Sequence, residues 1–166
     1  MFPASHVCFS GAVGSNPMNL TFLGASREVG RSAFLVEGRE NLLLDCGVKP
    51  AKNPDYPLLD PRTMRALDRV ILSHAHLDHS GFLPALYAAG YKGTVTLTKP
   101  TRDLIQLLLA DFLRLNGDNS PYAQKDVDKL LKSTALLEFD ELSKPARGYP
   151  SRLRVAGHIL GAAITE

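Results

Sequence analysis

The sequence predicts an α/β protein in which a mixed sheet is flanked by helices. Short runs of aliphatic and β-branched residues recur along the chain, as strands require. From about residue 69 onward these runs alternate with stretches of helical periodicity, the pattern of a layered sheet with helices. The chain has 166 residues, of which 45% are hydrophobic and 22% charged, so it can bury the core of one globular domain.

The first half of the chain is predicted to contain mainly strands. Residues 19–24 alternate and end at a glycine, and residues 32–38 and 40–47 are two further strand candidates joined by a hairpin-type connection. Several prolines indicate a loop over residues 48–62, and a short helix over 62–68 is expected next. Residues 69–73, RVILS, have no amphipathic period, which is typical of a buried strand.

The second half is predicted to alternate between helices and strands. Residues 81–90 favour a short helix closed by Gly90, and residues 93–98 favour a strand. Residues 100–117 give the clearest helix, which Gly117 would end. Ser120 as N-cap and Pro121 as first helical residue predict another helix, and residues 151–166 are strand-like.

Composition excludes several classes of protein. Cys8 and Cys46 form no CxxC pair, so we expect neither a disulfide framework nor a cysteine zinc site, and a reducing, cytoplasmic setting is indicated. The longest apolar run is broken by Asp111 and Arg114, so no membrane association is expected. The net charge of +2 does not by itself mark a nucleic-acid-binding protein, and any site for a polyanion must be local.

The N-terminal residues differ from the rest of the chain. Residues 1–17 lack the basic and continuous apolar segments of a signal peptide. A more regular pattern begins at Met18. We therefore expect residues 1–17 to be a disordered leader and residues 18–166 to form the domain, with either Met1 or Met18 as the start of the working protein.

The stretch SHAHLDHSG, residues 73–81, concentrates groups that bind metals. His74 and His76 are two residues apart, so their imidazoles can converge on one ion, and Asp78 and His79 can serve a second ion beside it. Imidazole and carboxylate together suit zinc, with manganese or iron as rivals. The stretch follows a buried strand and precedes a helix, where α/β proteins place ligand sites.

This motif resembles the HxHxDH signature of the metallo-β-lactamase superfamily. The stretches FLGASREVGRS, LLLDCGVKP, LTKPTRDLIQLLLAD and AGHILGAA, at residues 22–32, 42–50, 97–111 and 156–163, are similar to segments of its β-CASP ribonuclease branch. That branch includes RNase J and the cleavage and polyadenylation specificity factor endonucleases. The similarity extends from about residue 18 to residue 166.

The resemblance implies two adjacent zinc ions in a complete site and hydrolysis of RNA phosphodiester bonds in RNA processing or decay. The implied ligands are His74, His76 and His158 for one metal, and Asp78 and His79 for the second. Asp78 would also position or deprotonate the attacking water. Asp45 would orient the site from just outside the ligands, although a role in a strand-end turn is an equal alternative.

Three arginines are candidate phosphate contacts. Arg27, Arg31 and Arg102 lie in segments that resemble the family, and RNA is the implied partner. Ion pairs within the protein or a solvated surface position would explain these arginines equally well.

Several parts of the family's catalytic domain are not matched by these residues. They are the aspartate that bridges the two metals, the β-CASP domain, and the second half of the αββα sandwich. We therefore expect this chain to form the N-terminal half of the sandwich and to be inactive alone. It would bind one zinc ion, or a second zinc ion only weakly. A second chain, or a homodimer, would complete the site. The alternatives are a non-catalytic module that binds zinc or complements a partner, and another hydrolase of the superfamily such as a thioesterase.

Overall fold

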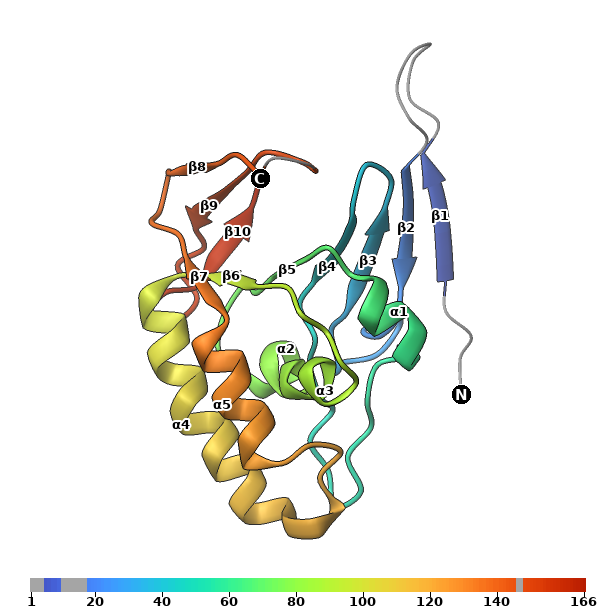
Figure 1. The fold of residues 1–166 in the computed structure, drawn as a ribbon, viewed down its shortest axis with the longest axis vertical. Helices are drawn as coiled ribbons and strands as arrows, with labels where there is room; N and C mark the ends of the chain where they lie inside the picture. Colours follow the sequence, from blue (N-terminus) through green and yellow to red (C-terminus); the bar gives the residue numbers. More distant parts are fainter. Residues whose placement is uncertain (1–4, 10–17, 146–147) are drawn as a thin grey trace.

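A seven-stranded mixed sheet forms the centre of the protein. The structure is a computed structural model that describes residues 5–9, 18–145 and 148–166 (Figure 1). The strands lie in sequence order: β1 (Ser5–Phe9), β2 (Met18–Phe22), β3 (Phe34–Glu37), β4 (Asn41–Leu44), β5 (Arg69–Ile71), β6 (Val95–Leu97) and β7 (Thr134–Leu136). Strands β1 to β4 pair antiparallel, and β4 to β7 pair parallel. The connections therefore change from hairpins to helical crossovers at β4. Asp45 is the residue directly after this strand.

In the described part of the chain, five α-helices connect or follow the parallel strands. They are α1 (Pro61–Ala66), α2 (Leu77–Ser80), α3 (Leu83–Ala88), α4 (Lys99–Asn116) and α5 (Gln124–Lys132), with a 3₁₀ turn, η1 (Gly117–Asn119), after α4. Asp60 caps α1 by accepting hydrogen bonds from the backbone amides of Arg62 and Thr63, and the Thr98 side chain caps α4. Within the described ranges, no helix combines the length and the apolar character needed to cross a bilayer.

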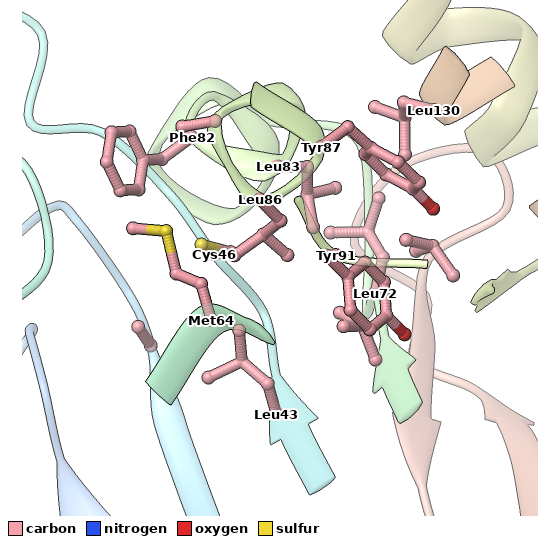
Figure 2. Close-up of a cluster of buried hydrophobic side chains, with 14 of the residues drawn as sticks. Leu43, Cys46, Met64, Leu72, Phe82, Leu83, Leu86, Tyr87, Tyr91 and Leu130 are labelled. Atoms are coloured by element: carbon pink, nitrogen blue, oxygen red, sulfur yellow. The ribbon is translucent and has the colours of Figure 1, made fainter. Parts of the chain in front are cut away.

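The main core lies between the helices and one face of this sheet. Met64 of α1, Leu86 of α3 and Leu130 of α5 belong to one buried cluster with Leu43 of β4 (Figure 2). Burial of these side chains is the main favourable term in holding the helices on the sheet. The helix layer also covers Cys46, a fully buried free thiol.

A second, three-stranded antiparallel sheet packs on the opposite face. It contains β8 (Leu142–Ser143), β9 (Ser151–Val155) and β10 (Ala163–Thr165), in the order β10-β9-β8. Leu42 and Ile71 of the large sheet form an apolar cluster with Leu153 of β9 and Ala163 of β10. The described residues therefore form three layers, helices, large sheet and small sheet, as the predicted α/β class with a mixed sheet and flanking helices requires.

A buried ion pair joins the two sheets at one end. Arg69, at the start of β5, donates to Glu40 at 2.8 Å and to Ser151 Oγ, at the start of β9, at 3.0 Å. The same guanidinium donates to the carbonyl of Tyr149, and the backbone amide of Tyr149 donates to Glu40. This network fixes the beginning of β9 against the large sheet.

Two expectations need correction. Residues 5–9, which we expected to lie in a disordered leader, form strand β1, because their backbone pairs in antiparallel register with β2; residues 1–4 and 10–17 lie outside the described residues. The last helix does not begin at Ser120 and Pro121 but at Gln124, with Ala123 as the N-cap. Tyr122 explains the later start, since its side chain is buried and its hydroxyl donates to the carbonyl of Gly81 at 2.8 Å.

Candidate metal centre

The histidine motif lies at the carboxyl end of β5 and runs into α2. Three backbone hydrogen bonds hold this short helix against neighbouring loops: Ser32 N to Asp78 O at 2.8 Å, Cys46 N to His79 O at 2.8 Å, and Val48 N to Leu77 O at 2.9 Å. Gly47 lies directly beneath α2, because a Cβ there would come within 1.8 Å of the Asp78 carbonyl oxygen. The motif is therefore positioned by contacts of its own backbone.

Three histidine nitrogens converge at this end of the sheet. His74 Nε2 lies 3.2 Å from His76 Nδ1, and His158 Nε2 lies 3.3 Å from the same atom. One ring nitrogen from each residue lies within 4.8 Å of those of the other two, which makes the group able to hold a metal ion. His74 is buried, whereas His76 and His158 are exposed. Three imidazoles with an open side match the protein ligands of a catalytic zinc site.

A second pair of donors lies next to this cluster. His79 Nε2 is 3.6 Å from Asp78 Oδ2, and the rings of His74 and His79 have centroids 4.1 Å apart. The structure thus brings together all five predicted ligands, in the two predicted groups. Whether each of them binds metal remains a prediction.

Asp45 connects the two groups of donors. Its Oδ2 accepts a hydrogen bond from Ser73 Oγ at 2.9 Å and lies 2.7 Å from His79 Nδ1, while its Oδ1 accepts from the Ser73 amide. Ser73 Oγ also lies 2.9 Å from His74 Nδ1. Because the serine proton goes to Asp45, His74 must donate from Nδ1, and His79 also donates from Nδ1 to the carboxylate. Both rings then present a free Nε2 lone pair to a metal.

Burial and charge shift the pKa values of these two rings in opposite directions. Burial, followed by the nearby charge of His79, lowers the pKa of His74 from 6.5 to about 4. Burial also acts to lower the pKa of His79, but the hydrogen bond and charge of Asp45, with the charge of Asp78, outweigh it and raise that pKa. His74 is therefore the ring that is neutral, and ready to bind metal, over the wider pH range.

The pKa of His74 predicts how acid affects the metal-free chain. A neutral His74 stabilises the fold fully above its unfolded pKa near 6.5, and this contribution is lost as the pH falls toward about 4. We expect His74→Gln to lose less of its free energy of unfolding than the unchanged chain over that interval, measured by urea unfolding. His79→Gln is the matched comparison and should lose as much as the unchanged chain, because the raised pKa of His79 makes its stabilising contribution fully present below about 6.5 and constant over this interval. Equal acid sensitivity of the two variants would contradict this assignment.

The segment that carries His158 is tied to both β5 and α4. The Ala163 amide donates to the Ser73 carbonyl at 2.8 Å, next to His74. Thr98 Oγ1 and Thr101 Oγ1 lie 2.8 and 3.0 Å from the Gly161 carbonyl. Gly161 has φ +80°, and a Cβ there would lie 2.7 Å from Thr98 Oγ1, so this close approach requires glycine. These contacts bring His158 to the other two histidines across 82 residues of sequence.

Removing one of these contacts should weaken the site without removing a ligand. Thr101 is fully buried, and Thr101→Val keeps its shape while leaving the Gly161 carbonyl with one hydrogen bond fewer. We expect a loss of about 1 kcal/mol in the free energy of unfolding, together with weaker zinc binding in a chelator competition. Thr134→Val removes a similar hydrogen bond, to Leu131 O at 3.1 Å, away from His158. Thr134→Val should lower the free energy of unfolding without changing zinc affinity. Equal zinc affinities in the two variants would refute the role of Thr101 in anchoring the His158 segment.

The three candidate phosphate-binding arginines lie in different surroundings. Arg31 is buried, with Nε 2.5 Å from Glu28 Oε1 and an NH group donating to the Tyr56 carbonyl. Arg102 is half-buried and lies 3.4 Å from Asp103. Arg27 is exposed and has φ +59°. Arg31 is therefore committed to contacts within the protein, whereas Arg27 has the exposure that a phosphate contact requires.

Two residues of the site escaped the sequence analysis. Ser73 links Asp45 to His74, and its signal in the sequence was only its position between a buried strand and the first histidine. Gly47 supports α2, and a glycine two residues after Asp45 gave no indication of what it would contact.

Proteins with similar sequences include a transcription termination factor and a probable RNase. The chain is 46% identical over 156 residues to transcription termination factor FttA of Methanothermobacter thermautotrophicus, an alignment that covers 89% of this chain and 24% of that protein. It is 38% identical over 150 residues to the probable RNase MJ4 of Methanocaldococcus jannaschii, covering 88% of this chain and 35% of that protein. The chain thus spans about a quarter to a third of the length of these relatives.

Solved structures share the fold at low identity. A subclass B3 metallo-β-lactamase from a soil metagenome, MEM-A1, has a TM-score of 0.54 and 18% identity, covering 87% of this chain and 52% of that one. A flavo di-iron protein variant from Thermotoga maritima has a TM-score of 0.57 and 12% identity, covering 99% and 40%. The family model of the metallo-β-lactamase superfamily matches residues 26–146. The predicted resemblance is confirmed, and the chain belongs to the metallo-β-lactamase superfamily.

Proposed function

We propose that this chain carries the metal-binding part of a ribonuclease of the β-CASP type, which hydrolyses RNA phosphodiester bonds. The observation that supports it most is the arrangement of two groups of donors around one carboxylate, Asp45. The relative named as a probable RNase favours RNA as the substrate class over a thioester. The buried thiol of Cys46 favours action in the cytoplasm.

The donors present fit zinc. His74, His76 and His158 would hold the first ion, and Asp78 and His79 would take part in holding a second. Zinc, when bound, supplies a Lewis acid for the phosphodiester and lowers the pKa of water. Two donors do not complete a zinc site, so the second ion requires ligands in addition to Asp78 and His79.

The protein's own residues set the geometry and proton positions. Asp45 and Ser73 keep the Nδ1 protons on His79 and His74, which would leave the Nε2 atoms of both rings free to bind metal. Asp78 is half-exposed beside His79 and can accept a proton from water at its free carboxylate oxygen. His76 and His158 are exposed, so a polymeric substrate can reach the site.

The proposal is tested by measuring zinc content, RNA binding and RNA cleavage on the same purified sample. We expect stoichiometric zinc that depends on His76 and His158, and RNA binding that weakens when zinc is removed. Cleavage is expected once the second site is filled, and His76→Ala should abolish it while Arg114→Ala, a substitution of an exposed residue on α4, should not. Thioester hydrolysis without RNA binding would refute the ribonuclease assignment, and zinc binding without any RNA binding would favour a non-catalytic module.

A further inference from the structure

We propose that a pocket beside the metal centre holds a nucleobase of the bound RNA, which places the neighbouring phosphodiester at the metal ligands. This inference rests on the proposed ribonuclease function and specifies how that function would recognise its substrate. The pocket has a volume of about 510 Å³. It opens between the loop after β2, the loop after β4, the start of α2 and one side chain of α4.

The walls of the pocket are mostly apolar. They include Val29, Pro50, Leu77 and Leu108. Val29 is 84% exposed, more than any other large hydrophobic residue in the described part of the chain. Covering such a side chain is favourable. A nucleobase has a flat face that packs on apolar side chains whatever the sequence, so these walls predict recognition of a base with little preference among bases.

Contacts between the two loops hold the walls of the pocket in place. Lys49 Nζ contacts Glu28 at 3.1 Å, and this bond ties the loop after β4 to the loop that carries Val29. Gly30 has φ +101°, and a Cβ there would lie 3.0 Å from the Lys49 side chain, so the two loops are packed against each other. Binding therefore requires little ordering of the walls, which lowers its entropic cost.

The position and polar lining of the pocket favour RNA over an apolar protein segment. Its lining includes His76 and Asp78, one member of each group of candidate metal donors, so an occupant would lie next to these donors. Lys49 also lines the pocket, and its partly exposed ammonium group can contact a phosphate, although the charges of Arg31 and Lys49 are balanced overall by Glu28 and Asp78. A base in the pocket with its phosphodiester between Lys49 and the metal ligands uses both features. An apolar peptide would use only the walls.

The test combines a protein substitution with RNA that lacks one base. The zinc-loaded chain is titrated with a fluorescent five-nucleotide RNA and with versions in which each position in turn is abasic. We expect one abasic position to raise Kd about tenfold, the loss that corresponds to one base packed on a protein surface. Val29→Asn, which adds no charge, should raise Kd for intact RNA and have little effect on the RNA that is abasic at that position, because both changes remove the same contact. Leu115→Asn changes an apolar, 69% exposed residue of α4 away from the pocket, and should leave Kd unchanged.

The outcomes separate this inference from the function on which it rests. If the wild-type chain binds RNA but every abasic version binds equally well, or if the effects of Val29→Asn and base removal multiply, the pocket does not hold a base and the ribonuclease proposal stands. If the wild-type chain binds no RNA, both proposals fail. If Val29→Asn leaves RNA binding intact but abolishes self-association of the wild-type chain, the pocket is a protein contact instead.

Discussion

Gly47→Ala should reduce the free energy of unfolding by about 3 kcal/mol or more and abolish zinc binding. The added Cβ would lie 1.8 Å from the Asp78 carbonyl oxygen and 2.6 Å from the His79 amide nitrogen. Both are backbone atoms of α2, so no flexible side chain can move aside. Relief would require moving α2 away and breaking the hydrogen bonds from Cys46 and Val48 that hold it.

Urea unfolding and zinc competition would measure the two effects. Gly117→Ala is the matched control, because Gly117 has φ +51° but no atom lies within 4 Å of the position that an alanine methyl group would take. It should cost about 1–3 kcal/mol, from its backbone conformation (φ +51°, ψ −132°) alone, and leave zinc binding unchanged. If Gly47→Ala kept the zinc affinity of the unchanged chain, the close approach beneath α2 would be wrong.

Asp45→Asn should weaken zinc binding by about 10- to 100-fold while leaving the fold intact, the range typical of residues that orient metal ligands. Asp45 has φ +58°, and asparagine adopts this left-handed conformation as readily as aspartate, so the backbone can be retained. The substitution removes the charge that fixes the Nδ1 proton of His79 and accepts the Ser73 hydroxyl. In the metal-free chain, the pKa of His79 should fall, because the hydrogen bond and charge of Asp45 are what raise it.

Chelator competition and histidine titration by NMR would report these changes. Asp140→Asn provides the control. Asp140 also has a positive φ, +66°, but its carboxylate pairs with exposed Arg154 rather than with a histidine. It should alter neither zinc affinity nor the His79 titration. An unchanged zinc affinity for Asp45→Asn would show that the carboxylate has only a turn-forming role.

Local patterns predicted much of this fold, and long-range contacts decided what they missed. The strands around Leu43 and Val70 were predicted because their apolar runs are local signals. Strand β7 was not, because Thr134–Leu136 follows a helix closely and becomes a strand only by pairing with β6. The start of α5 was misplaced because burial of Tyr122 outweighed the preference of Ser120 and Pro121 for a helix start.

In the candidate site too, local patterns were predictable and long-range contacts were not. His74 and His76 were evident from their spacing, and His158 was assigned through the family resemblance rather than from its own neighbours. The role of Ser73 could not be predicted, because it depends on a carboxylate 28 residues away. A single sequence specifies which residues carry the chemistry more readily than which residues hold them in place.

The buried Arg69 network has a mechanical consequence for the distant metal centre. β9 is five residues long, so about 16 Å of strand separates its anchored start from the loop that carries His158. The Arg69 network holds one end of this strand at Ser151, and the contacts of Gly161 and Ala163 hold the chain beyond its other end. His158 therefore lies in a span that is fixed on both sides, which limits how far its ring can move from that of His76.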